Sequence, residues 1–152
     1  MAGPLEGLKV VDFSRVLAGP LCARTLADLG ADVIKIEPPR PDVSRAAFPN
    51  RDGMSGYYAQ QNSGKRNVSI DLNAPHAREF VLRLCDEADI IVENFRAGTL
   101  KGFGLDYDTL ARRNPKPWPR ACRTAAAAYS SSGSRRCARL WPVTAACARG
   151  DG

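Results

Sequence analysis

The chain has 152 residues, a length typical of one domain, and a formal net charge of +6. Residues 1–114 hold 15 basic and 15 acidic residues, whereas residues 115–152 hold 7 basic residues and one acid, so the whole excess lies in the second segment. No run of 18 apolar residues suggests a membrane span, and no charged start followed by an apolar stretch suggests secretion. We therefore expect a cytoplasmic protein without a membrane partner.

The first elements are expected within residues 8–36. Residues 8–13 form a short apolar run suited to a buried parallel strand. Pro20 suits the first turn of a helix, and Gly30 suits its end. Residues 32–36 read as a second strand, so the segment has the size of a βαβ start. The inward helix face is predicted from the residues at helical spacing, which are Leu21, Thr25, Leu26 and Leu29.

Less regular sequence follows before the periodic patterns resume. Residues 40–64 are polar and interrupted by proline and glycine, which predicts a long loop with one short helix near Tyr57. Residues 67–72 read as a strand, and Asn73 is a candidate N-cap for the next helix. The apolar stripe of that helix is expected to be Ala77, Phe80, Val81, Leu84, Cys85 and Ala88. A strand over 89–92 and short helices at 99–102 and 107–113 complete the pattern.

Alternating strands and helices predict an α/β fold with a Rossmann-like parallel sheet and flanking helices. We expect residues 1–114 to form this unit and residues 115–152 to form a disordered or irregular basic tail. Ligands of such sheets bind beyond the carboxyl ends of the strands. This rule selects the loops 14–20, 37–45 and 93–98 as candidate binding loops.

The loop 14–20 combines a following helix N-terminus with the cation Arg15, which favours a phosphorylated ligand. The alternative is an ordinary turn with a surface arginine. A dinucleotide site, with Glu37 binding a ribose, is disfavoured because the G-x-G-x-x-G spacing is absent. Pro20 also removes an N–H group that a pyrophosphate would use.

Other polar residues leave alternatives open. Lys65 and Arg66 either hold phosphates or solvate the end of a loop. Arg96 follows a buried strand with Asn94 and Phe95, a combination that can grip a base, a phosphate or a carboxylate, or it forms a structural salt bridge. His76, the only histidine, is expected to be an exposed helix residue. No cluster has metal-ligand spacing, and Cys22 and Cys85 are expected to be buried, inert thiols.

Three groups of motifs resemble one known family. They occur in order over about residues 4–116, at residues 5–12, 17–20 and 29–37, then 64–72, then 88–98 with Gly104-Leu105. They resemble the class III coenzyme A transferases, the family of formyl-CoA transferase, carnitine CoA-transferase and α-methylacyl-CoA racemase. The resemblance implies transfer of CoA between an acyl-CoA and a carboxylic acid through intermediates on an aspartate, with CoA as acyl carrier, no metal, and interlocked homodimers.

The resemblance also implies which residues contact CoA. The first loop would contribute Arg15, Leu17 and Ala18, and Arg40 would lie near the adenosine phosphates. The adenine side would be lined by Ile70, Asp71, Leu72 and Asn73. The pantetheine or phosphate side would be lined by Asn94, Phe95 and Arg96.

The resemblance stops near Pro115, where the family continues with an apolar strand. Residues 115–152 are instead rich in Arg, Ala, Ser, Cys and Pro, and we hypothesise an out-of-frame reading of a GC-rich gene. The family's catalytic aspartate is expected beyond this point, so no catalytic residue is assigned and the chain alone is expected to be inactive. A racemase-type fragment and a CoA-binding fragment without catalysis remain alternatives. The tail shows no periodic basic face, so no nucleic-acid partner is expected.

Overall fold

The computed structural model describes residues 3–114 and the backbone of residues 139–141. The elements in chain order are β1 (Lys9–Asp12), α1 (Ala18–Asp28), β2 (Asp32–Glu37), the 3₁₀ helix η1 (Val43–Ala46), β3 (Asn50–Arg51), β4 (Met54–Ser55), α2 (Gly56–Asn62), β5 (Arg66–Ser69), α3 (Ala77–Glu87), β6 (Ile90–Glu93), α4 (Thr99–Gly102), α5 (Tyr107–Arg113) and β7 (Arg139–Trp141).

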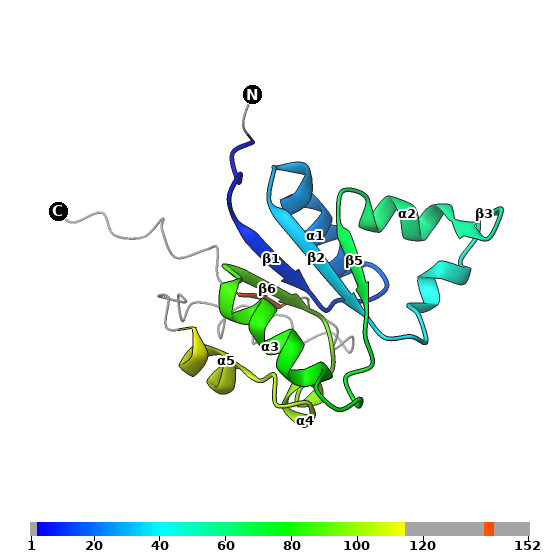
Figure 1. Cartoon of the computed structure of the whole chain (residues 1–152). Coiled ribbons are helices and arrows are strands. Elements are labelled where there is room, and N and C mark those ends of the chain that lie inside the picture. Colours follow the sequence, from blue (N-terminus) through cyan, green and yellow to red (C-terminus); the bar gives the residue numbers. More distant parts are fainter. Residues whose placement is uncertain (1–2, 115–138, 142–152) are drawn as a thin grey trace, which may run out of the picture.

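One main sheet organises the chain, with the strand order β5-β2-β1-β6-β7. The first four strands of this order are parallel, and Val11 of β1 lies opposite Ile34 of β2 and Ile91 of β6 (Figure 1). The predicted α/β fold with a parallel sheet is therefore confirmed. The predicted irregular tail concerns residues that lie mostly outside the described ones, but Arg139–Trp141 form β7, which pairs antiparallel with β6.

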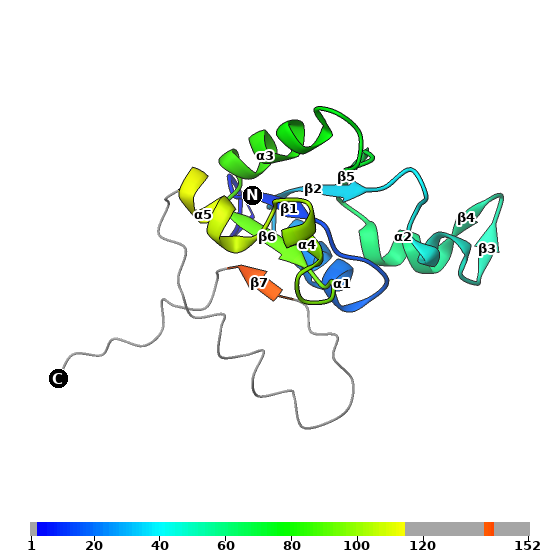
Figure 2. The same cartoon turned by 90° about the horizontal axis from the view of Figure 1, so that it is seen from below.

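Helices cover both faces of the sheet, as Figure 2 shows: α1 lies on one face, and α3 with α5 on the other. Successive strand residues point to opposite faces. Val10, Val33 and Ile90 accordingly pack with Ala23 and Leu26 of α1. Val11, Ile36 and Ile91 pack in a second cluster with Val81, Leu82 and Cys85 of α3 and Leu110 of α5.

The predicted inward face of α1 is wrong in part. Leu26 is buried, but Leu21, Thr25 and Leu29 are exposed. The buried residues of α1 are Gly19, Pro20, Ala23 and Leu26. Small residues take the inward positions at the start of α1 because it lies close to the loop after β1, and Leu21 and Leu29 turn outward. Gly30 adopts a φ of 103°, as the helix-end prediction requires.

The predicted start of α3 is also wrong. Its N-cap is His76, which is exposed and has a φ of 67°, and the helix begins at Ala77 rather than just after Asn73. The Asn73 side chain instead donates to Asp71 Oδ1 at 2.9 Å within a turn. The inward face of α3 also differs from the predicted one, since Leu82 is buried whereas Phe80 is 47% exposed.

Residues 40–64 hold more structure than a loop with one helix. After β2 the chain forms η1, the two-stranded hairpin β3–β4 and α2, which project beside the sheet (Figure 1). The predicted helix near Tyr57 is α2. The hairpin region carries exposed apolar side chains, among them Phe48 at 88% exposure.

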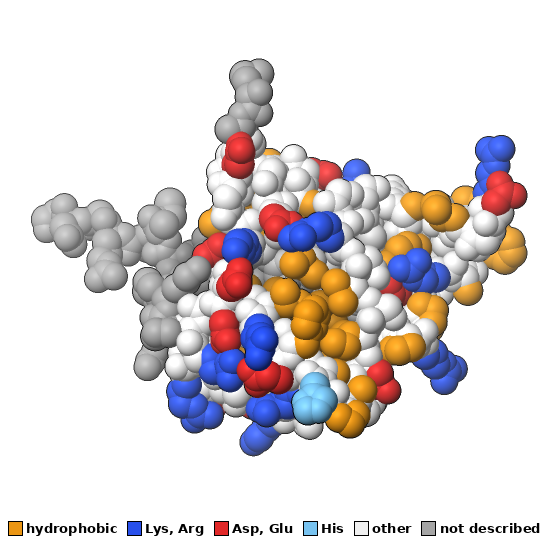
Figure 3. Space-filling model, in the orientation of Figure 1, with side chains coloured by type: hydrophobic (Ala, Val, Ile, Leu, Met, Phe, Trp, Pro, Cys, Tyr) orange, Lys and Arg blue, Asp and Glu red, His pale blue; other side chains and the backbone are white. Residues whose placement is uncertain are grey.

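The α3 face of the sheet is not fully covered. Figure 3 shows hydrophobic side chains gathered beside α3 on this face, and Ile34 of β2 and Val68 of β5 are only partly buried against the core. Cys85 is buried, and burial raises the pKa of its thiol to about 12, which makes it inert as expected. Cys22 is only half-buried. In the described part of the chain, no helix is both long and apolar enough to cross a bilayer.

The packing of α3 generates a stability prediction. Leu82→Ala removes a side chain that is 2% exposed, and should lower the free energy of unfolding by about 2–5 kcal/mol. Arg83→Ala, at the neighbouring exposed position, should change it by no more than about 0.5 kcal/mol. Urea denaturation of both variants measures the difference. Equal losses would contradict the described orientation of α3.

Candidate functional site

The three loops selected by the carboxyl-end rule are joined by hydrogen bonds. The Arg15 N–H donates to Asn94 Oδ1 at 2.8 Å, and Asn94 Nδ2 donates back to the Arg15 carbonyl at 2.7 Å. The Val16 N–H donates to Asp42 Oδ2 at 2.8 Å. The loops after β1, β2 and β6 therefore form one connected edge of the sheet.

A buried cluster of three charged side chains lies beneath this edge. Asp12 and Lys35 share the α1 face of the sheet with Val10 and Val33, and both are at most 1% exposed. Lys65 Nζ lies 2.8 Å from Asp12 Oδ2, and Lys35 Nζ lies 4.0 Å from the same oxygen. Charges are costly to bury unless they are paired. We therefore expect this group of two cations and one carboxylate to have a structural role.

The cluster holds both ends of the loop 14–20. Asp12 Oδ1 accepts hydrogen bonds from the Ser14 N–H, at 2.8 Å, and from the Ser14 hydroxyl. Lys35 Nζ donates to the Ser14 carbonyl at 2.6 Å. Lys65 Nζ donates to the Pro20 carbonyl at 2.9 Å and to Asn62 Oδ1 at 3.0 Å. Burial lowers the pKa of Lys65 although the neighbouring Asp12 carboxylate opposes this shift.

A second polar cluster surrounds Glu37 at the end of β2, where 4% of the residue is exposed. Arg45 donates from Nε at 2.8 Å and from Nη2 at 2.7 Å to the Glu37 carboxylate. Tyr58 Oη donates at 3.1 Å, Asn67 Nδ2 at 2.9 Å and the Asp42 N–H at 2.8 Å. Burial alone would raise the pKa of Glu37, but the bonds from Arg45, Asp42 and Asn67 outweigh it and lower the pKa to about 2.

Five donor contacts leave the Glu37 carboxylate occupied within the protein. Arg45 also stacks over the Tyr58 ring, 3.8 Å from its centroid, and burial together with the Glu37 charge raises the pKa of Tyr58. A ribose hydroxyl would have to displace these partners. The geometry therefore agrees with the sequence argument against a dinucleotide site that uses Glu37.

Two backbone features shape the loop 14–20. Val16 has a φ of 69°, a conformation that is unfavourable for a β-branched residue. Gly19 lies so close to its neighbours that an added Cβ would be 2.2 Å from Ser14 Cβ and 3.2 Å from Asn94 Cγ. Only glycine allows α1 to begin this near the loop, so Gly19 and the surrounding bonds define the loop's path.

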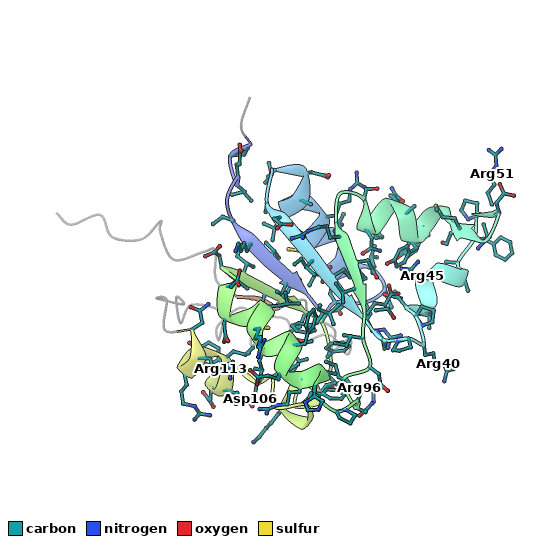
Figure 4. The ribbon with its side chains drawn as sticks, in the orientation of Figure 1. Arg40, Arg45, Arg51, Arg96, Asp106 and Arg113 are labelled. Atoms are coloured by element: carbon teal, nitrogen blue, oxygen red, sulfur yellow. The ribbon has the colours of Figure 1, made fainter. Side chains whose placement is uncertain are left out.

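The predicted CoA-contacting residues lie at this edge with different exposures. Arg15 and Asn94 contact each other directly, and both are half-buried. Leu17, Ala18, Arg40 and Arg96 are exposed, and Figure 4 shows Arg40 and Arg96 at the end of the molecule to which the strands point. Asp71 and Asn73 are exposed on the segment after β5, whereas Ile70, Leu72 and Phe95 are partly buried against the core.

For Lys65 both predicted alternatives, phosphate binding and a solvated loop end, are wrong, whereas Arg66 is exposed to solvent. The Lys65 side chain is 1% exposed and bound to Asp12, and Arg66 pairs with Asp32. The sequence reasoning also missed Asp12, Lys35 and Asp42 as residues that shape the site. A signal for two of them exists, because Asp12 and Lys35 lie two residues after the buried Val10 and Val33, on the same inward face of their strands.

Comparisons with known proteins place the chain in a family. The family model CoA-transferase family III matches residues 5–117. A succinyl-CoA:mesaconate CoA-transferase of Haloarcula hispanica is 43% identical over 118 residues, which cover 74% of this chain and 30% of the relative. A succinate–glutarate CoA-transferase of Agrobacterium fabrum is 44% identical over 121 residues, which cover 74% of this chain and 30% of the relative.

The solved structures agree. The crystal structure of a CaiB/BaiF family protein from Brucella suis matches with a TM-score of 0.70 and 44% identity, covering 75% of this chain and 32% of that one. The chain therefore belongs to CoA-transferase family III, and it spans about 30% of the length of the relatives it matches. Among the described residues, no group of three or more His, Cys, Asp or Glu side chains could hold a metal ion.

The close approach at Gly19 predicts a specific sensitivity. Gly19→Ala places a methyl group 2.2 Å from Ser14 Cβ and should lower the free energy of unfolding by about 1–3 kcal/mol. Gly102→Ala is the matched control in α4, where no described residue beyond the neighbouring helix backbone comes within 4 Å of the added Cβ. This variant should be neutral or stabilising by up to about 1 kcal/mol. A Gly19→Ala chain as stable as the Gly102→Ala chain in urea would contradict this packing.

The Glu37 cluster predicts a pH dependence of stability. The pKa of Glu37 falls from the ordinary 4.5 to about 2 on folding, so the carboxylate contributes on the order of 3 kcal/mol above pH 4.5. This contribution should disappear as the pH falls from 4.5 to 2. The difference in unfolding free energy between wild type and Glu37→Gln should therefore shrink across this window. A difference for Glu37→Gln that stays constant across this window would refute the assignment.

Proposed function

We propose that the carboxyl edge of the sheet binds coenzyme A, and that the protein to which this segment belongs transfers CoA between an acyl-CoA and a carboxylic acid. The observation that carries this proposal is that hydrogen bonds at Arg15 and Val16 join the loops after β1, β2 and β6. These loops belong to a chain of CoA-transferase family III. Residues 1–114 would be the N-terminal part of the family's large domain, and residues 115–152 would lie outside it.

The distribution of paired charges supports an anionic ligand at this edge. Within the described residues, Arg15, Arg40 and Arg96 form no ion pair, whereas Arg45, Arg66 and Arg113 each bind a carboxylate. Guanidinium groups without a carboxylate partner remain available for phosphate oxygens. Coenzyme A carries a diphosphate and a 3′-phosphate, so its charged end fits a site with three such cations.

The apolar and backbone groups suit the rest of coenzyme A. The N–H groups of the N-cap Leu17 and of Ala18, the first residue of α1, have no hydrogen-bond partner among the described residues. They can donate to a phosphate or carbonyl oxygen. Ile70 to Asn73 would line the adenine, and Asn94, Phe95 and Arg96 would face the pantetheine or a phosphate. The Asn94 amide would act through Arg15, because its oxygen and nitrogen already bind the Arg15 backbone.

No residue of this chain is assigned as the nucleophile, so binding without transfer is the expected behaviour of the chain alone. The family resemblance implies an aspartate nucleophile, and the relatives compared above are named as transferases, which favours transfer over racemisation. We further propose a homodimer for the complete protein. A cytoplasmic location is consistent with the free thiols of Cys22 and Cys85.

Isothermal titration of the purified chain tests the binding proposal. Coenzyme A should bind, and Arg15→Ala should weaken the affinity about tenfold, the equivalent of 1.4 kcal/mol. Arg112→Ala removes an exposed guanidinium on α5 and should leave the affinity unchanged. NADH should not compete, because Glu37 is occupied by Arg45. A folded wild-type chain that binds no CoA, or that binds NADH at the same place, would refute the proposal.

A further inference from the structure

Val16 is the strained point of the candidate binding loop. Its φ of 69° lies in the left-handed region, which disfavours side chains that branch at Cβ. Such a conformation persists only where surrounding contacts enforce it. Val16 directly precedes Leu17 and Ala18, so its conformation sets the direction in which their N–H groups point.

One side chain binds the Val16 backbone directly. Asp42, which is 2% exposed, accepts the Val16 N–H at Oδ2 over 2.8 Å and the Ser44 N–H at Oδ1 over 3.0 Å. The Asp42 N–H is itself bound to Glu37 Oε1 at 2.8 Å. The carboxylate is thus fixed by β2 and by η1, and it transmits their position to Val16.

We propose that Asp42 is a positioning residue for coenzyme A, because its carboxylate holds Val16 in the left-handed conformation that directs Leu17 and Ala18 toward the ligand. The inference rests on the proposed function. It adds Asp42 to the residues of the site, as one that acts without contacting the ligand. It also gives a role to the contacts between residues 40–64 and Glu37, because the hydrogen bond from the Asp42 N–H to Glu37 fixes the position of Asp42.

A purely structural alternative exists, because Asp42 also caps η1 through Ser44. Asp42→Ser separates the two roles. A serine N-cap retains a side-chain oxygen for the Ser44 N–H, but it is too short to reach Val16 as well. Asp42→Ser should therefore weaken CoA binding about as much as Asp42→Ala if positioning is the cause.

Val16→Gly supplies the rescue, because glycine adopts positive φ without the side-chain penalty. CoA titrations should show an approximately tenfold loss of affinity for Asp42→Ala and Asp42→Ser. Adding Val16→Gly to either should restore the affinity to within about threefold of wild type. Ser44→Ala, which removes a buried hydroxyl without a hydrogen-bond partner in the described residues, is the matched control and should bind as wild type does.

A second readout needs no ligand. Amide hydrogen exchange at Val16 in the free chain should speed up at least tenfold in Asp42→Ser and remain slow in Ser44→Ala. Unchanged affinity in both Asp42 variants, unchanged Val16 exchange, or failure of Val16→Gly to rescue a folded variant would each overturn the inference alone. A wild-type chain that binds no CoA would instead overturn the proposed function, and the inference with it.

Discussion

The pairing of Asp12 with Lys65 and Lys35 beneath the carboxyl edge of the sheet is the constraint on which the rest of the site depends. Burial removes hydration from all three side chains, so their charges must be satisfied by one another and by nearby backbone carbonyls. Removing one partner of a buried pair typically costs about 3–5 kcal/mol, because the other charge is left uncompensated. Those carbonyls belong to Ser14 and Pro20, and the charge cluster therefore fixes the loop between them.

The position of the loop 14–20 follows from the fold in successive steps, and it determines which groups are left for a ligand. Parallel pairing brings the ends of β1, β2 and β6 to one edge. Asn94 then holds Arg15, and Asp42 holds Val16. With these groups occupied, the exposed cations and the first N–H groups of α1 remain for a ligand. A binding loop held in advance loses less entropy when the ligand arrives, which is the advantage of preorganisation.

Much of the fold follows from local patterns. The apolar run at 8–13 and the glycine at position 30 indicate elements whose limits tertiary contacts barely change. The inward faces of α1 and α3 were predicted less well. Leu21 fits a helical stripe as well as Ala23 does, but the close approach of Gly19 to Ser14 decides which side turns inward. The sequence pattern likewise predicts that Phe80 is a core residue. In the structure, the backbone conformation at His76 sets the rotation of α3, and Phe80 is exposed.

The candidate site, like the fold, was predictable from the sequence only in part. The carboxyl-end rule selected three loops that hydrogen bonds join at one edge of the sheet, because the rule depends only on strand direction. Lys65 and Asp12 are 53 residues apart in sequence, and no local pattern shows that they pair. Their partnership is visible only once β1 and α1 are placed against the start of β5. The positive φ of Val16 was equally hidden, since a valine there contradicts its local preference.

Crystal structures of the chain with and without coenzyme A test the central claim most directly. The account predicts that the backbone of residues 13–20 shifts by less than about 1 Å on binding, with the Asp12–Lys65 pair and the Asp42–Val16 bond intact in both states and the CoA phosphates near Arg15. A loop that is rebuilt around the ligand, a broken Asp12–Lys65 pair in either state, or CoA bound at another edge of the sheet would contradict it.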